Sequence, residues 1–206
     1  DVQRGYRFWH DQDVRDDVMA LVFIKSQTAD EDCELTFHHG VNDVVLDGTY
    51  NEYQFYFVNM HPESEDGDSR KFMFQVNADG ESGFNETITS TAFDAYHDEA
   101  DSGTSLGYNA SRDQAQGTAY QQLNYGLGAA GDESCSGVLT LYGPASTTYV
   151  KHFTAVTQET YFANYSLQMF VAGYINTTAA IDEISFKMSS GNIDSGVIKM
   201  YGIAKS

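Results

Sequence analysis

The chain has 206 residues, 41% of them hydrophobic and 14% aromatic, which is enough to bury one sizeable core and excludes disorder of the whole chain. Its 30 acidic and 11 basic residues give a formal net charge of −19, so a phosphate backbone is a disfavoured partner and we expect no nucleic-acid binding. No apolar run approaches the roughly 18 residues of a membrane helix, so no membrane insertion is expected.

The first 17 residues have no clear period and are predicted to be an N-terminal arm or linker, followed by one β-sandwich domain over residues 18–206. This arm contains the only tryptophan of the chain and three of its 11 basic residues. Since aromatic side chains often anchor protein interfaces, we expect Tyr6, Phe8 and Trp9 to contact a neighbouring subunit. An ordinary first strand or a mobile terminus is the alternative.

Apolar and polar residues alternate with a period of two through most of the remaining chain. Examples are "EYQFYFV" (Glu52–Val58), "KFMFQV" (Lys71–Val76), "LQMFV" (Leu167–Val171) and "IDEISFKM" (Ile181–Met188). Such alternation is typical of antiparallel strands with one buried and one solvated face. We expect ten strands, which begin near Val18, Cys33, Glu52, Arg70, Thr118, Gly137, Thr148, Tyr165, Ile181 and Gly196. The pattern predicts an all-β fold, an antiparallel two-sheet sandwich of jelly-roll type with little helix.

Two segments depart from this pattern. A helical turn is expected in "STAFDAYHDEA" (Ser90–Ala100) and a short helix in "DQAQGTAYQQL" (Asp113–Leu123), but neither segment combines an apolar stripe with both helix caps. The stretch of residues 84–113 is long, polar and weakly patterned, and it predicts an elaborated loop at one end of the sandwich. Loops of this length often contact partners.

The phrase "SGVLTLYG" (Ser136–Gly143) is nearly repeated as "SGVIKMYG" (Ser195–Gly202). Each copy is predicted to open with a Ser-Gly turn, to form one strand and to end at the glycine after its tyrosine. The inward residues are expected to be Leu139, Leu141, Ile198 and Met200. The repeat therefore indicates two strands of one design and not a catalytic motif.

No residue pattern predicts a catalytic, cofactor or metal site. His38 and His39 are adjacent, so in a strand they would point to opposite faces and could not bind one metal together. The acidic clusters over residues 30–34, 63–69 and 97–101 lack the order of a calcium-binding loop and are interpreted as solvated turns. We therefore predict a chain that is not an enzyme. An acid-dependent glycoside hydrolase or lyase is a minor alternative, because carboxylate spacing is a three-dimensional property.

The two cysteines, Cys33 and Cys135, are too few for a disulfide framework and are predicted to be free, buried thiols, with a disulfide between them as the alternative. The N-x-S/T triplets at Asn85, Asn109 and Asn164, like the one at Asn176, are interpreted as a product of composition.

Three segments together resemble a known family. They are "YNEYQFYFVNMHP" (Tyr50–Pro62), "SGVLTLYGPASTTYVKHF" (Ser136–Phe153) and "VAGYINTTAAIDEISFKMSSGNIDSGVIKMYGI" (Val171–Ile203). They are similar to a family of tailed-phage virion proteins that is widespread in marine phages and cyanophages. The resemblance covers roughly Met19 to the C-terminal end, and its phrases are specific only in combination.

The resemblance implies a non-enzymatic structural component of a virion: an exposed capsid decoration or head-fibre protein, or a tail or fibre component. It implies other virion proteins as partners, a homo-oligomer, and no catalytic, cofactor-binding or metal-binding residue. The acidic net charge independently favours the exterior surface of the virion over a DNA-lined interior. The alternative is a carbohydrate-binding β-sandwich module, the receptor-binding tip of a fibre, with a host-surface glycan as its partner.

Overall fold

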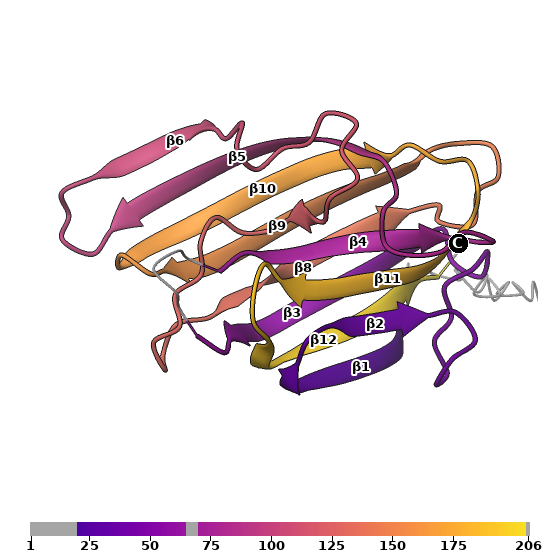
Figure 1. Cartoon of the computed structure of the whole chain (residues 1–206), viewed down its shortest axis with the longest axis horizontal. Helices are drawn as coiled ribbons and strands as arrows, with labels where there is room; N and C mark the ends of the chain where they lie inside the picture. Colours follow the sequence, from indigo (N-terminus) through magenta and orange to yellow (C-terminus); the bar gives the residue numbers. More distant parts are fainter. Residues whose placement is uncertain (1–19, 65–69, 205–206) are drawn as a thin grey trace, which may run out of the picture.

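The computed structural model describes residues 20–64 and 70–204, and these residues form two antiparallel sheets packed face to face (Figure 1). The strands are β1 (Leu21–Asp32), β2 (Leu35–His38), β3 (Glu52–Pro62), β4 (Phe72–Ala78), β5 (Ile88–Asp98), β6 (Thr104–Tyr108), β7 (Gln121–Gln122), β8 (Cys135–Tyr142), β9 (Lys151–Tyr161), β10 (Tyr165–Ile175), β11 (Ile181–Met188) and β12 (Ile193–Ile203). The described residues contain no helix, and so none that could cross a membrane. The predicted all-β sandwich is confirmed.

The two sheets differ in width. One has eight strands in the order β1-β12-β3-β8-β9-β10-β5-β6, and the other has four in the order β2-β11-β4-β7. Because the smaller sheet is narrower, β5 and β6 extend past it at one side of the molecule (Figure 1). We call the face of the eight-stranded sheet that points away from the smaller sheet the outer face.

The core lies between the sheets and is built by the predicted alternation. Phe186 of β11 is its centre, with ring centroids 5.3 Å from Phe57 of β3 and 5.9 Å from Phe72 of β4. Phe55 of β3 and Phe74 of β4 complete this cluster, one from each sheet. All five side chains are buried, so every second residue of these strands is fixed to the inside.

The structure corrects the predicted loop over residues 84–113. β5 pairs with β10 along its whole length, and β6 pairs with β5 at the edge of the larger sheet. The expected helical turn over residues 90–100 is therefore a strand, and the expected helix over residues 113–123 contains only the two-residue strand β7. Along β5, the inward residue Ala92 is apolar and buried, whereas the next inward residues, Asp94 and Tyr96, are only half-buried. The smaller sheet does not cover this end of the strand. Apolar alternation fades there and hides the strand.

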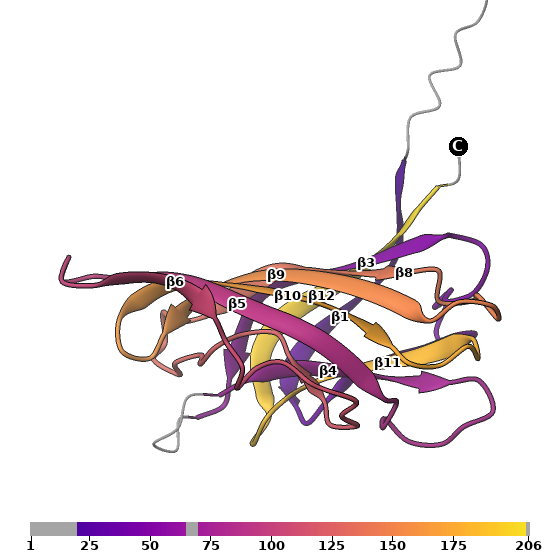
Figure 2. The same ribbon diagram turned by 90° about the horizontal axis from the view of Figure 1, so that it is seen from above.

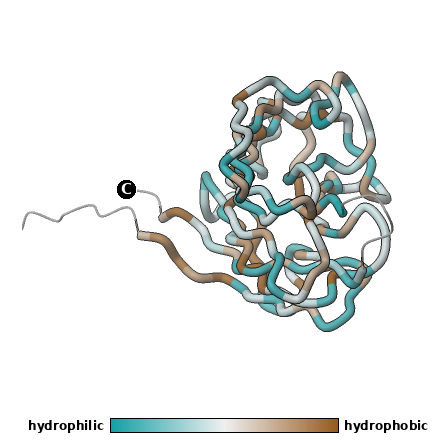
Figure 3. The backbone as a smooth tube through the Cα atoms, turned by 90° about the vertical axis from the view of Figure 1, so that its left-hand side faces the viewer, coloured by the Kyte–Doolittle hydropathy of each residue, from teal (hydrophilic) through white to brown (hydrophobic). Residues whose placement is uncertain are grey.

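The first residues of β1 and the last residues of β12 rise together at one side of the larger sheet. Leu21–Phe23 pairs with Tyr201–Ile203, and this ribbon projects from the outer face (Figure 2), while Tyr201 and Gly202 still pair with β3. Leu21 and Phe23 are 44% and 57% exposed. Figure 3 shows that apolar residues line the ribbon up to its end. The ribbon is thus an apolar projection from an otherwise acidic molecule.

The two copies of the repeated phrase lie on either side of one strand, because β12 and β8 are the two neighbours of β3. Their predicted inward residues are buried. The predicted Ser-Gly turns are wrong, since both dipeptides lie inside strands. The predicted strand end is correct at Gly143, which directly follows β8, but wrong at Gly202, which lies inside β12. Gly137 lets β9 approach closely, because a Cβ there would lie 2.3 Å from the carbonyl oxygen of Val156. Gly196 has a φ of 128° and faces the bulged part of β3 at Asn59, so both glycines are needed for packing.

Candidate functional site

A row of paired side chains crosses the outer face from one edge of the larger sheet to the other. Directly opposite residues in the register share a face. The row consists of Tyr108, Phe93, Phe170, Val156, Val138, Tyr56, Lys199 and Ser26. The rings of Phe93 and Phe170 stack with centroids 4.7 Å apart, while Phe93 is still 43% exposed and Tyr108 61% exposed. The outer face therefore presents a continuous, mainly apolar strip to solvent.

Half of this face is free of formal charge. The outward residues of β5, β6, β8, β9 and β10 include no Asp, Glu, Lys or Arg, and only His97 and His152 can become charged. The acidic residues Asp94, Asp98 and Glu159 of these strands occupy inward positions. In a chain with a net charge of −19, this separation leaves one broad surface on which a neighbour meets no like charge.

The ribbon meets the outer face at an aromatic corner. Tyr201 of β12 packs edge-to-face against Phe23 and Tyr56, with centroid separations of 5.5 Å in both cases. A hollow of about 250 Å³ lies at this corner, lined by Leu21, Tyr56, Val58, Lys199 and Tyr201. The ribbon rises beside the strip (Figure 2), and the hollow lies where the two meet.

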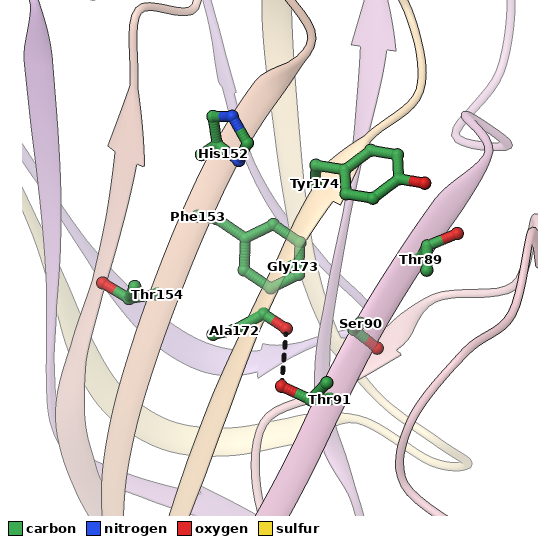
Figure 4. A pocket seen from close by; sticks show the side chains of 9 residues that line it. All are labelled: Thr89, Ser90, Thr91, His152, Phe153, Thr154, Ala172, Gly173 and Tyr174. Carbon is green, nitrogen blue, oxygen red and sulfur yellow. Dashed lines mark hydrogen bonds between the residues drawn. The ribbon is translucent and has the colours of Figure 1, made fainter.

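A second hollow, of about 390 Å³, lies at the other side of the outer face over β9, β10 and β5 (Figure 4). It exists because Ala172, the outward residue of β10, is small and stands between Thr91 and Thr154. His152 and Tyr174 close one end, with ring centroids 6.4 Å apart. Hydroxyl and imidazole groups therefore surround a shallow apolar floor, an arrangement that can accept hydrogen bonds from a polar ligand.

A smaller and more enclosed pocket lies on the inward side, at the end of the larger sheet that the smaller sheet leaves uncovered. Four tyrosines surround it: Tyr96 from β5, Tyr161 from β9, Tyr165 from β10 and Tyr125 from the loop after β7. The lining is completed by Asp94 and Leu167, and the volume is about 160 Å³. We call this the tyrosine pocket.

The rings of the tyrosine pocket are held in position by contacts within the protein. Tyr96 and Tyr165 stack with centroids 5.1 Å apart, and Tyr161 lies 5.4 Å from both Tyr165 and Tyr125. The guanidinium carbon of Arg112 lies 4.8 Å from the centroid of the Tyr125 ring, and its Nη2 donates to the Tyr125 carbonyl oxygen at 2.9 Å. Packing therefore fixes each ring in place.

Glu159, an inward residue of β9, anchors the loop that carries Tyr125. Its carboxylate accepts hydrogen bonds from the backbone N–H groups of Tyr125 and Gly126 at 2.9 Å and from the side-chain amide of Asn124. Burial raises the pKa of Glu159 from 4.5 to about 7, and these hydrogen bonds and Arg112 oppose that rise. Since Glu159 is only 2% exposed, its role is to hold the loop and not to meet a substrate.

The cysteines only partly follow the prediction. Both are free, and Cys135 is buried, but Cys33 is exposed in the turn after β1. Burial and the nearby Glu159 raise the pKa of the Cys135 thiol well above its ordinary value. Cys135 is therefore not an activated nucleophile.

The predicted interface residues Tyr6, Phe8 and Trp9 lie outside the described residues. Most of the acidic cluster over residues 63–69 also lies outside them. Among the residues that the structure describes, no three His, Cys, Asp or Glu side chains are placed to share a metal ion. His38 lies 3.4 Å from Glu183, whereas His39 accepts a hydrogen bond from the N–H of Leu46.

Sequence reasoning missed the outer strip and the tyrosine pocket, because both depend on β5 and the strip also depends on β6. The outward series Phe93, Ala95 and the inward series Asp94, Tyr96 are the two faces of one strand, a signal that was present in the sequence. Comparisons of the chain with protein-family models, with curated proteins and with solved structures return no match.

Proposed function

We propose that this chain is a non-enzymatic structural component of a tailed-phage virion, an exposed capsid decoration or head-fibre protein or a tail or fibre component. In this proposal it acts through contacts with other virion proteins, including further copies of itself. The virion assignment rests on the resemblance of its three segments to that family. The observation that supports action through subunit contacts is the half of the outer face that carries no formal charge, together with the projecting ribbon.

The chemistry of the outer face suits a protein neighbour. Aromatic side chains at exposed, well-packed positions are the usual anchors of interfaces, and Phe93, Phe170 and Tyr56 are of this kind. Each apolar Å² removed from water contributes about 25 cal/mol, so covering a strip that spans eight strands supplies a large driving force. The acidic remainder of the surface keeps copies apart elsewhere and directs association to this face.

Light scattering combined with particle imaging tests this proposal. The unaltered chain is expected to form a defined oligomer or to attach to phage particles. A Phe93→Glu variant, which places a charge in the strip, is expected to abolish that association while remaining folded. Tyr149→Glu is the matched control, because Tyr149 is 72% exposed but lies in the loop before β9. Equal association of both variants would contradict the proposal.

A second candidate, a carbohydrate-binding module, is favoured by the hollow shown in Figure 4. Its threonine hydroxyls, together with His152 and Tyr174, offer hydrogen bonds and an aromatic surface to a sugar ring. A glycan array tests it, with His152→Ala as the variant that should lose binding. Binding of no glycan by the unaltered chain, or equal binding by the variant, would reject this candidate.

A further inference from the structure

We propose that the tyrosine pocket binds a compact organic cation, a methylated ammonium group of the kind found in choline or in trimethyllysine. The proposal is independent of the virion assignment and of the outer face, because the pocket lies on the opposite side of the larger sheet. It assigns a ligand class to Tyr96, Tyr125, Tyr161, Tyr165 and Asp94.

The pocket has room for a small organic group. Its volume is about 160 Å³, whereas a single water needs only about 10–15 Å³ of such space. A trimethylammonium group, with a nitrogen and four attached carbons, can therefore be accommodated. The choice among small ligands rests on the chemistry of the lining.

The chemistry of the lining favours a positive charge. Aromatic ring faces and phenolic oxygens are both electron-rich, and clusters of aromatic side chains are the usual binding sites of quaternary ammonium groups. Asp94 supplies a carboxylate at the wall of the pocket, where its Oδ1 accepts a hydrogen bond from Asn109 at 2.8 Å. That bond orients the carboxylate. The net charge of −19 adds a field that attracts cations to the whole molecule.

Arg112 does not occupy the pocket. It lies against the ring of Tyr125 but is not part of the lining, and its side chain donates to the Tyr125 carbonyl oxygen. Its charge acts on Glu159 and also on Tyr161, where it opposes the rise in pKa that burial causes. It therefore supports Tyr125 from outside, in the manner of a second layer that holds a binding residue in position.

Nuclear magnetic resonance titration of the full chain with choline and with tetramethylammonium tests the proposal. Both cations are expected to bind saturably and to shift tyrosine ring signals. The neutral analogue 3,3-dimethylbutan-1-ol, which has the shape of choline without its charge, is expected to bind at least about tenfold more weakly. A peptide that contains trimethyllysine is titrated separately. Tighter binding of this peptide than of choline would identify a protein side chain as the source of the cation.

Three variants make the test specific. Tyr165→Phe keeps the ring and should change the choline affinity by less than about threefold, whereas Tyr165→Leu should weaken it by about fivefold or more. Asp94→Asn removes the charge with little change in shape and should also weaken binding by about fivefold. Unfolding curves establish that each variant is folded. Equal affinity for choline and its neutral analogue, tighter binding of glucose, or no binding of either cation would overturn the proposal.

Discussion

Phe93 of β5 and Phe170 of β10 lie directly opposite each other on the outer face, and their rings stack with centroids 4.7 Å apart. Among the described residues, no further strand covers this pair, and the ribbon rises above the same face (Figure 2). Aromatic pairs in an isolated molecule are normally placed in the core, where burial stabilises them. Their position here is explained if a neighbouring subunit completes the burial, which is the central claim of the proposed function.

The ribbon should contribute to association without contributing much to folding. We predict that replacing Leu21 and Phe23 together by serine weakens assembly by at least about tenfold, because these apolar side chains are 44% and 57% exposed and available to a neighbour. The free energy of unfolding should change by less than about 1 kcal/mol. Val41→Ser is the control, since Val41 is 48% exposed but lies in the turn after β2. Light scattering and urea unfolding measure the two effects, and unchanged assembly of the double variant would exclude the ribbon from the interface.

Two glycines of the larger sheet should differ sharply in their tolerance of alanine. A Cβ at Gly137 would lie 2.3 Å from the Val156 carbonyl oxygen, so Gly137→Ala should push β8 and β9 apart and destabilise the chain by roughly 1–3 kcal/mol. A Cβ at Gly107 of the edge strand β6 meets nothing within 4 Å, so Gly107→Ala should be within about 0.5 kcal/mol of the unaltered chain. Urea unfolding measures both changes. Equal effects would contradict the close approach of β8 and β9.

Most of the sandwich could be predicted from the sequence, because its strands have one buried face. All ten expected strands correspond to observed ones and begin within three residues of the expected positions. The repeated phrase was also correctly interpreted as two strands, although their shared neighbour β3 could not be known. Pairing of strands that are distant in sequence depends on the register of the whole sheet and not on a local pattern.

The candidate sites are difficult to predict for a physical reason, although the two faces of β5 alternate in the sequence. Asp94 and Tyr96 point inward in β5 but are not covered by the smaller sheet, so no apolar residues are needed there. Phe93 points outward and is exposed, so in this part of β5 the apolar residue lies on the solvent side and the polar residue on the inner side. A strand with an apolar outward face and a polar inward face looks like a loop when burial is inferred from hydropathy alone.

Protonation of Glu159 should make stability depend on pH. The folded chain holds a proton on Glu159 up to about pH 7, whereas an unburied glutamate releases it near pH 4.5. The folded state therefore binds more protons between these values, and stability falls as the pH rises from about 4.5 to about 7, by roughly 3 kcal/mol at most. Urea unfolding at pH 5 and pH 8 measures the difference. The Glu159→Gln side chain cannot titrate, so this variant should show a smaller difference in the free energy of unfolding between the two pH values. An undiminished difference would assign the effect to other groups.

The two thiols should react at very different rates. We predict that maleimide modifies the exposed Cys33 of the native chain within minutes but leaves Cys135 unmodified until the chain unfolds. Burial excludes the reagent from Cys135, and its raised pKa keeps the thiol protonated. Mass spectrometry of peptides from native and urea-treated samples measures both rates. Rapid modification of Cys135 in the native chain would contradict the buried position of β8.

Hydroxyl-radical footprinting of the chain, free and bound in its assembled state, tests the role of the outer face most directly. The proposed function predicts that Tyr56, Phe93 and Phe170 become several-fold less reactive on assembly, because a neighbour covers the strip. Tyr149 should react equally in both states, since it lies outside the strip. Full reactivity of all three strip residues in the assembled state would show that the outer face is not the interface.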